Sequence, residues 1–146
     1  MTTDTAKAGP RMVPLREGMF RMPEQIDMPA ALLGNRCRKC NERFFPPRVF
    51  CAACSSGDME AVEFAGTGEI TTCTIVHQQP PNSVMVPPYA IIRLKLDDGP
   101  QIQTVVASDD LGNVRIGARA RLLVRRLKED DAGNTVVSFM ARPIPA

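Results

Sequence analysis

The sequence predicts a mainly β protein with three parts: an N-terminal arm (residues 1–33), a cysteine module (34–58) and a β domain (59–146). Three observations predict this organisation. Thirteen prolines in 146 residues argue against long helices, because proline removes a helical hydrogen bond. Four of the five cysteines form two C-x-x-C pairs in the central segment. Beyond that segment, runs of alternating apolar and polar residues are separated by turn sequences, which is the pattern of half-buried strands.

The composition excludes several classes of protein. The chain is 44% hydrophobic and 23% charged, which is typical of a globular domain. Its net charge of +2 gives no electrostatic reason to expect nucleic acid or an anionic membrane as the main partner. No run approaches the roughly 18 apolar residues of a membrane helix, and the N-terminus lacks the basic and apolar regions of a signal peptide. We therefore expect a cytoplasmic protein without a membrane partner, in a compartment that keeps thiols reduced.

The N-terminal arm has little periodicity. Residues 1–12 are small and polar, and we expect them to be disordered. Residues 13–33 carry scattered apolar side chains that Pro14, Pro23 and Pro29 interrupt. Such a segment has too little pattern to fold alone. It either packs on its own domain or covers an apolar surface of a partner.

The β domain is predicted to contain five strands. The first is long and is bent at Gly66 and Gly68, where glycine permits a sharp turn of the backbone. The sequence Asp97-Asp98-Gly99 is a turn signal between two alternating runs and predicts a hairpin. The five strands lie within residues 61–79, 89–99, 100–108, 118–130 and 134–143. This number of strands favours a Greek-key barrel of the oligonucleotide/oligosaccharide-binding (OB) type, and a five-stranded sandwich is the alternative.

The cysteine module has the ligand count of a tetrahedral metal site. The four candidate ligands are Cys37, Cys40, Cys51 and Cys54. Zn–S distances near 2.3 Å require four sulfurs at the corners of a small tetrahedron, and each C-x-x-C turn supplies two of them. The ten-residue spacer predicts a minimal ribbon of the rubredoxin type. We predict structural zinc without an open position for water; iron in the same site and a redox role for the cysteines are the alternatives.

The two cysteine turns differ in the residue that follows them. Such knuckles often place glycine directly after the second cysteine, where the backbone is left-handed. Asn41 and Ser55 occupy these positions here, and Gly57 comes later. Asparagine tolerates the left-handed conformation. We therefore expect the second knuckle to be less regular than the first.

No set of catalytic side chains is found elsewhere, and we predict no catalytic residue in this chain. Cys73 lies in an alternating run and is interpreted as a small buried apolar residue. His77 is the only histidine, and no Ser, Cys or Asp stands beside it. Arg119, Arg121 and Arg125 share one face of a predicted strand, as in an ordinary half-solvated strand. Nucleic-acid binding is not expected, because only 5% of the residues are aromatic and stacking groups are lacking.

Taken together, several segments resemble one family. They are LLGNRCRKCNERFFPPRVFCAAC, VEFAGTGEITTCTIV, PPYAIIRLKLDDG, IGARARLLVRR and the terminal FMARP. The combination resembles the zinc-ribbon/OB-fold family known as domain of unknown function 35, from about Leu32 to Pro143. The resemblance implies a short helical N-terminal arm, a rubredoxin-like ribbon and a C-terminal OB barrel.

The resemblance also implies a function. Members of this family accompany thiolase-superfamily enzymes, in which the thiolase-like chain carries the catalytic cysteine and histidine. The implied role is a non-catalytic subunit of a heteromeric acyltransferase, which docks on the catalytic chain and helps to shape its acyl-CoA site. A CoA thioester would be the substrate of the complex, and the chain's length and arm suit the type that cleaves benzoylsuccinyl-CoA. The alternatives are a free-standing OB module for acyl-CoA or nucleic acid and a hydrolase that uses His77.

The loop between the knuckles is the predicted contact surface. It offers apolar groups and cations together, and its predicted contact residues are Arg43, Phe44, Phe45, Pro46, Pro47, Arg48 and Phe50. Phenylalanines are common anchors at interfaces, and the arginines are suited to a CoA phosphate or a partner carboxylate. The two prolines leave the loop little entropy to lose on docking. The alternative is that one or two of the phenylalanines form the ribbon's own core.

Overall fold

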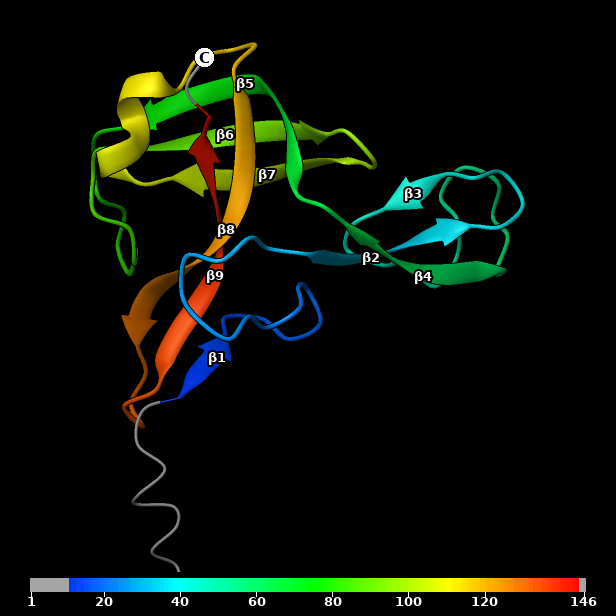
Figure 1. Cartoon of the computed structure of the whole chain (residues 1–146), viewed down its shortest axis with the longest axis horizontal. Helices are drawn as coiled ribbons and strands as arrows, with labels where there is room; N and C mark the ends of the chain where they lie inside the picture. Colours follow the sequence, from blue (N-terminus) through cyan, green and yellow to red (C-terminus); the bar gives the residue numbers. More distant parts are fainter. Residues whose placement is uncertain (1–10, 145–146) are drawn as a thin grey trace, which may run out of the picture.

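The computed structural model describes residues 11–144, so the predicted disorder of residues 1–12 falls mostly outside the described residues. Its strands lie in two sheets, which form a larger and a smaller lobe (Figure 1). The elements are β1 (Met12–Pro14), β2 (Leu32–Cys37), β3 (Arg43–Phe44), β4 (Met59–Phe64), β5 (Thr67–Val76), β6 (Tyr89–Leu96), β7 (Gln101–Val106), the 3-10 helix η1 (Ser108–Asn113), β8 (Arg119–Glu129) and β9 (Thr135–Pro143). The predicted mainly β class is confirmed. Within residues 11–144 no helix has the length and apolarity needed to cross a membrane.

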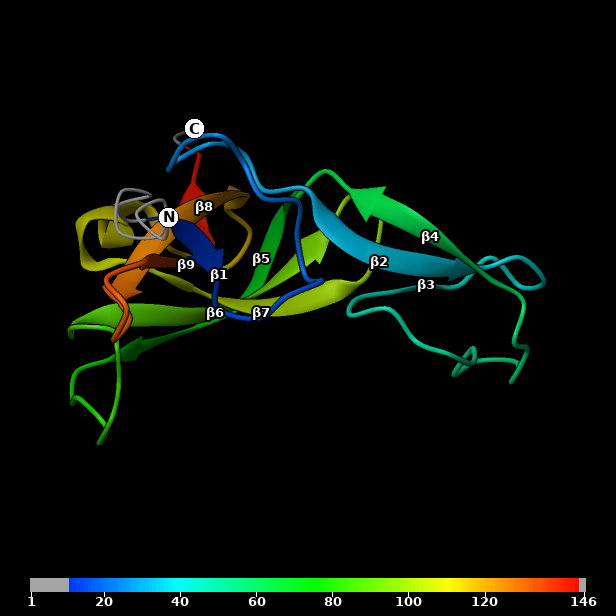
Figure 2. The same cartoon turned by 90° about the horizontal axis from the view of Figure 1, so that it is seen from below.

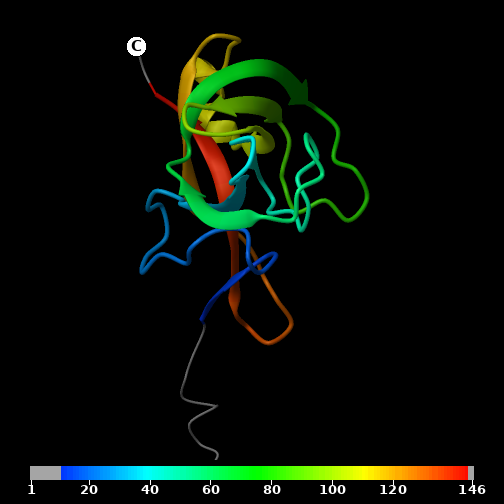
Figure 3. The same ribbon diagram turned by 90° about the vertical axis from the view of Figure 1, so that its right-hand side faces the viewer.

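The larger lobe is a barrel of five strands. Its strands are hydrogen-bonded in the order β9-β8-β5-β6-β7, and all of these pairs are antiparallel. The two end strands approach one another, and Thr104 Oγ1 of β7 donates to the Phe139 carbonyl oxygen of β9 at 3.3 Å. Viewed from the side of the smaller lobe, β5 curves around the barrel (Figure 3). This strand order and closure are those of an OB-fold, as predicted, rather than of a sandwich.

Alternating side chains build the barrel core. In β6, Ile92, Leu94 and Leu96 are buried, whereas Arg93 and Lys95 between them are exposed. This period of two is what the sequence pattern predicts for a strand with one buried face. The predicted hairpins are both present, with β6 paired to β7 and β8 paired to β9.

The predicted long strand over residues 61–79 is in fact two strands in different sheets. Its first part, β4, pairs with β2 in the smaller lobe, and its second part, β5, begins the barrel. Gly66 separates them with φ of 79°, a left-handed conformation that only glycine adopts readily. The prediction was wrong because a period-2 pattern shows that a segment is extended but not which sheet it joins.

The arm also differs from the expectation, because residues 11–33 contain no helix. Its β1 pairs in parallel with β9. Further along, Asp27 N–H donates to the Val124 carbonyl at 2.7 Å, and Ala30 N–H donates to the Leu122 carbonyl at 2.9 Å. The prolines prevent a continuous helix, and β8 and β9 supply the hydrogen-bond partners instead. The arm therefore packs on its own domain, as one of the two readings of its sequence predicted.

The smaller lobe is a three-stranded sheet of order β3-β2-β4 that extends away from the barrel (Figure 2). Polar and apolar contacts join the two lobes. Arg43 Nη1 donates to the Asp98 carbonyl at 2.7 Å, and Ala65 N–H donates to Asp98 Oδ2 at 3.1 Å. The Phe64 ring lies against Gly99. The β6–β7 turn therefore holds the smaller sheet at a defined position.

Gly68 tests the close packing of β5 on β6. A Cβ atom at this position would lie 2.1 Å from the carbonyl oxygen of Lys95, which is backbone and has little room to move. We expect Gly68→Ala to lower the free energy of unfolding by about 1–3 kcal/mol in urea denaturation. Gly112→Ala is the matched control, because its Cβ meets nothing within 4 Å, and should stay within about 0.5 kcal/mol of wild type. Equal stability of the two variants would contradict this packing.

Candidate metal centre

The four predicted ligands converge at one end of the smaller sheet. The Sγ atoms of Cys37, Cys40, Cys51 and Cys54 all lie within 4.8 Å of one another. The Sγ atoms of Cys37 and Cys54 are 3.5 Å apart, as are those of Cys40 and Cys51. A regular zinc tetrahedron with bonds near 2.3 Å has edges of roughly 3.8 Å. The donor set and its spacing therefore fit a tetrahedral thiolate site of the zinc-ribbon type.

The two knuckles have the same backbone geometry. Asn41 N–H donates to the Cys37 carbonyl at 2.9 Å, and Ser55 N–H donates to the Cys51 carbonyl at 2.8 Å. Asn41 has φ of 69° and Ser55 has φ of 67°. The expectation of a less regular second knuckle is therefore wrong. Serine adopts the left-handed conformation here because the turn requires it, although the position favours glycine.

Backbone donors in the knuckles favour the ionised sulfur. The backbone N–H groups of Cys40 and Lys39 lower the pKa of the Cys37 thiol to about 6, against the opposing effect of burial. Burial raises the pKa of Cys51, but the N–H groups of Cys54 and Ala53 outweigh it and the pKa is lowered. Their distances to Cys51 Sγ are 3.4 and 3.3 Å. At Cys40 and Cys54 the N–H groups of Glu42 and Ser56 act in the same direction, but side-chain hydrogen bonds with Cys51 and Cys37 and burial outweigh them, and the pKa of each thiol is raised. The backbone therefore favours thiolate, the form that binds metal, at Cys37 and Cys51.

The site has no core of its own beyond the cysteines. Between residues 37 and 58 the only buried residues are Cys37 and Cys51. A segment with so little buried apolar surface cannot hold its shape by the hydrophobic effect alone. Four protein sulfurs also fill every position of a tetrahedral ion, so the arrangement has no place for a reacting water. Its chemistry is therefore that of a structural clamp.

The loop between the knuckles is divided into an anchored part and an exposed part. The Phe45 ring lies edge-on to Phe139 of β9, with ring centroids 5.8 Å apart, and packs against the barrel core. Phe44 is half-buried, and the guanidinium carbon of Arg48 lies 5.4 Å from its ring centroid. These two phenylalanines thus pack within the chain. The alternative reading expected a core of the ribbon itself, but Phe45 packs on the barrel instead.

The tip of the loop is exposed. Val49 is 77% exposed and Phe50 is 63% exposed. Pro46, Pro47 and Arg48 are also exposed. Val49 was not among the predicted contact residues, although it lies between two of them, Arg48 and Phe50. The exposed tip, defined as residues 46–50, combines apolar side chains with one cation.

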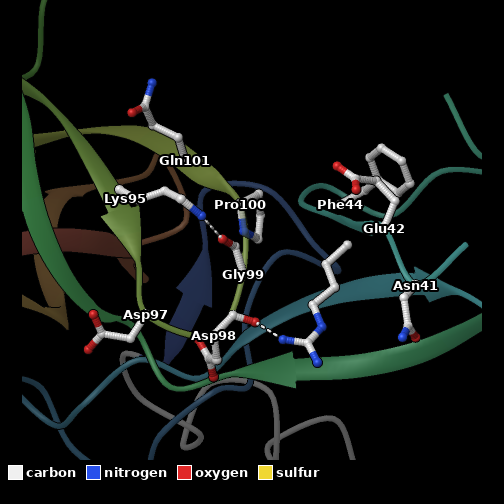
Figure 4. Close-up of a pocket in the computed structure, with 10 residues that line it drawn as sticks. Asn41, Glu42, Phe44, Lys95, Asp97, Asp98, Gly99, Pro100 and Gln101 are labelled. Atoms are coloured by element: carbon white, nitrogen blue, oxygen red, sulfur yellow. Dashed lines mark hydrogen bonds between the residues drawn. The ribbon is translucent and has the colours of Figure 1, made fainter. Parts of the chain in front are cut away.

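Arg43 lies away from this tip and faces the barrel. It borders a groove of about 680 Å³ between the ribbon and the β6–β7 turn. Figure 4 shows this groove, with Phe44 and Glu42 on one side and Lys95 and Gln101 on the other. The structure thus places Arg43 and Arg48 at different sites, whereas the prediction from the sequence grouped them as one pair of cations.

Two polar residues that hold the loop and the smaller sheet were not among the predicted site residues. Asn35 is buried, and its Nδ2 donates to the Arg48 carbonyl at 2.6 Å, which fixes the base of the loop. Asp98 receives bonds from Arg43 and Ala65. Asp98 was read as a turn residue, and no sequence signal connected either side chain to a loop so distant along the chain.

The remaining candidates lie apart from the metal centre. Cys73 is half-buried and packs against the barrel core, in agreement with its interpretation as a small apolar residue. His77 is exposed directly after β5. Neither residue is one of the four clustered ligands.

Comparison with known proteins agrees with this architecture. Residues 31–60 match the family model described as the ChsH2 rubredoxin-like zinc ribbon domain. Residues 61–125 match the model described as the ChsH2 C-terminal OB-fold domain. The boundary between these two family models, at residues 60 and 61, falls inside β4, which the structure places in the ribbon's sheet.

Similar proteins and structures carry related descriptions. A DUF35 domain-containing scaffold protein of Methanocaldococcus jannaschii is 30% identical over 77% of this chain and 82% of its own length. One of Pyrococcus furiosus is 27% identical over 77% and 83%. A probable enoyl-CoA hydratase alpha subunit of Thermomonospora curvata is 30% identical over 59% of this chain, but only 27% of that protein is matched.

Among solved structures, a chain of the Ltp2-ChsH2(DUF35) aldolase superposes with a TM-score of 0.54 at 29% identity. The match covers 77% of this chain and 84% of that one. Sequence, family models and structure thus agree on the same two-domain pattern. The chain therefore belongs to the DUF35 family and has the zinc ribbon and OB-fold of its ChsH2-type members.

Proposed function

We propose that this chain is a non-catalytic subunit that docks on a thiolase-superfamily enzyme and helps to form its acyl-CoA site. One observation carries this proposal: a closed four-cysteine clamp holds out a tip whose apolar side chains are largely exposed. Val49 and Phe50 at this tip are among the large hydrophobic side chains that the chain leaves exposed. Exposed aromatic and aliphatic groups on a rigid loop are typical anchors of protein interfaces.

The related proteins support a role beside an enzyme. The M. jannaschii and P. furiosus relatives are named scaffold proteins, and the superposed structure is an aldolase that contains ChsH2 together with Ltp2. The hydratase relative has a name that refers to a CoA thioester substrate. A thiolase-type partner for this chain is our inference from its family resemblance. Cleavage of benzoylsuccinyl-CoA is the specific reaction that we propose for the complex.

The described residues supply little for independent catalysis. His77 is exposed and Cys73 packs in the barrel, so they do not form a nucleophile and base pair enclosed by the fold. The cysteine clamp offers no open metal position. We therefore assign the catalytic cysteine and histidine to the partner chain.

We also propose that the ion in the clamp is zinc. Zinc accepts four thiolates in a tetrahedron and has no redox chemistry, which suits a site whose only task is to hold two knuckles together. Binding of roughly 10–16 kcal/mol, as in other small zinc modules, would replace the missing apolar core of the ribbon. Iron remains the alternative that metal analysis distinguishes.

Co-purification tests the proposed role. The tagged chain is co-expressed in turn with the thiolase-superfamily proteins of the same organism. We expect one of them to co-purify and to cleave an acyl-CoA thioester only as the complex. His77→Ala in this chain should leave that activity unchanged, whereas loss of the partner's catalytic cysteine should abolish it. A partner that is fully active alone would overturn the proposal. Tight RNA binding with a steep salt dependence would instead support a nucleic-acid module.

Metal analysis tests the clamp. Anaerobically purified protein should contain one zinc ion per chain. Cys40→Ser removes one of four ligands, and we expect metal content to fall well below one ion per chain, with loss of partner binding. The strand signal of the barrel in circular dichroism should persist, because the barrel has its own core. Cys73→Ser is the matched control and should retain metal and binding. Full complex activity of Cys40→Ser would refute the role of the clamp.

The exposed and anchored phenylalanines should behave differently on truncation. Phe50→Ala should weaken partner binding by about tenfold or more, as for an interface anchor, while unfolding free energy stays within about 0.5 kcal/mol of wild type. Phe45→Ala should lower unfolding free energy by about 2–3 kcal/mol, because it removes the packing on Phe139. Calorimetric titration and urea denaturation measure the two quantities. Unchanged binding by Phe50→Ala would contradict the assignment of the tip.

A further inference from the structure

We propose that the free edge of β4 receives an extended segment of the catalytic partner, which adds a fourth strand to the ribbon's sheet. β4 lies at one end of the three-stranded sheet, with β2 as its only neighbour within residues 11–144. This inference rests on the proposed function, because it specifies how the partner is held. The occupant is a strand with apolar side chains at alternate positions.

The hydrogen-bond pattern shows which groups of β4 face outward. Arg38 N–H donates to the Asp58 carbonyl at 2.9 Å, in the same register as the β2–β4 pairs. In an antiparallel ladder every second residue directs both backbone groups toward its neighbour. The backbone N–H and C=O groups that point toward β2 are therefore those of Asp58, Glu60, Val62 and Phe64. The backbone groups that point outward, away from β2, are those of Met59, Ala61 and Glu63.

At the start of the strand the Met59 N–H donates to the Gly57 carbonyl at 3.0 Å, so the unpartnered outward groups are those of Ala61 and Glu63. The next outward N–H group, that of Ala65, donates to Asp98 Oδ2 at 3.1 Å. The N–H and C=O groups of Ala61 and Glu63 make no hydrogen bond to another residue within 11–144. They form a short, regular row of donors and acceptors. This is the template that an added strand requires.

The usual protection of an edge strand is missing here. Proteins blunt exposed edges with proline, bulges or unpaired charges. β4 contains no proline, and its six pairs with β2 run without a register shift. Its two charges are neutralised in place, because Glu60 is paired with Arg36 and Glu63 with Arg21. An incoming apolar strand would therefore meet little electrostatic repulsion.

An apolar groove of about 410 Å³ runs beside this edge. Its wall contains Leu33 of β2, Met59 and Ala61 of β4, and Pro47 of the exposed tip. Alternate side chains of an added strand would enter this groove while its backbone pairs with β4. Asn35, Glu60 and Glu63 also line the groove, and both carboxylates are paired with arginines. The mainly apolar wall favours an occupant with hydrophobic residues at every second position.

The edge and the exposed tip form one continuous surface. Pro47 belongs to both. At the other end of the tip, a Cβ at Gly57 would lie 3.3 Å from the Phe50 ring, so Phe50 packs beside the start of β4. The tip is the surface proposed above for docking the catalytic chain. Continuity with it selects that chain, rather than a second copy of this one, as the source of the strand.

Proline at position 61 tests the edge directly. Because the Ala61 N–H points outward, Ala61→Pro removes a donor of the edge without breaking a bond to β2. We expect partner binding to weaken by at least about tenfold, while Ala61→Ser, which keeps the N–H group, stays within about twofold of wild type. Both variants should keep one metal ion per chain and the wild-type circular dichroism spectrum. Equal binding by the two variants overturns the inference.

Site-resolved amide exchange on the wild-type protein provides a test without substitutions. In the free chain the N–H groups of Ala61 and Glu63 should exchange rapidly, whereas that of Val62 is protected by β2. In the complex all three should be protected. Unchanged exchange at Ala61 and Glu63 overturns the inference even if the partner binds. Absence of any wild-type complex overturns the proposed function instead. A dimer of the free chain that Ala61→Pro dissolves would show the wrong occupant.

Discussion

The convergence of four sulfurs on one point is the constraint on which the smaller lobe depends. The knuckles lie at either end of the loop, and each repeats the same turn with a left-handed residue after its second cysteine. Between residues 37 and 58 nothing but two of these cysteines is buried. The backbone N–H groups of the knuckles favour the thiolate form of Cys37 and Cys51, and thiolate is the form that binds the ion. The position of every loop residue therefore follows from the clamp and from the few contacts that reach the barrel.

Those contacts determine what the loop can present. Phe45 on Phe139 and Arg43 on the Asp98 carbonyl fix the root of the loop to β9 and to the β6–β7 turn. Asn35 holds the loop from beneath. Because these side chains make contacts inside the chain, the exposed tip is the part of the loop that remains free to contact a partner. A rigid tip loses little conformational entropy on docking, which favours tight association over a small area.

The strand edges of the two lobes differ in whether the chain's own backbone covers them. The arm pairs with β8 and β9 and so covers edges of the barrel hairpin with its own backbone. In the ribbon, by contrast, β4 keeps an uncovered edge next to a mainly apolar groove, and its two carboxylates are paired with arginines. An uncovered edge promotes unwanted association, so its retention beside the exposed tip is consistent with use in assembly. The same strand also links the lobes, since Phe64 at its end packs against the turn at Gly99.

The sequence by itself determined the class of fold, the four metal ligands, both barrel hairpins and the apolar role of Cys73. These features are local: they depend on spacing within a turn or on alternation within a strand. Only the tertiary structure decided that residues 61–79 divide between two sheets at Gly66, that the arm is extended, and that Arg43 and Phe45 face the barrel while Phe50 does not. It also showed that Asp98 and Asn35 form hydrogen bonds that hold the smaller sheet and the loop. Each of these outcomes depends on which distant backbone groups and side chains become neighbours, and neither periodicity nor spacing along the chain contains that information.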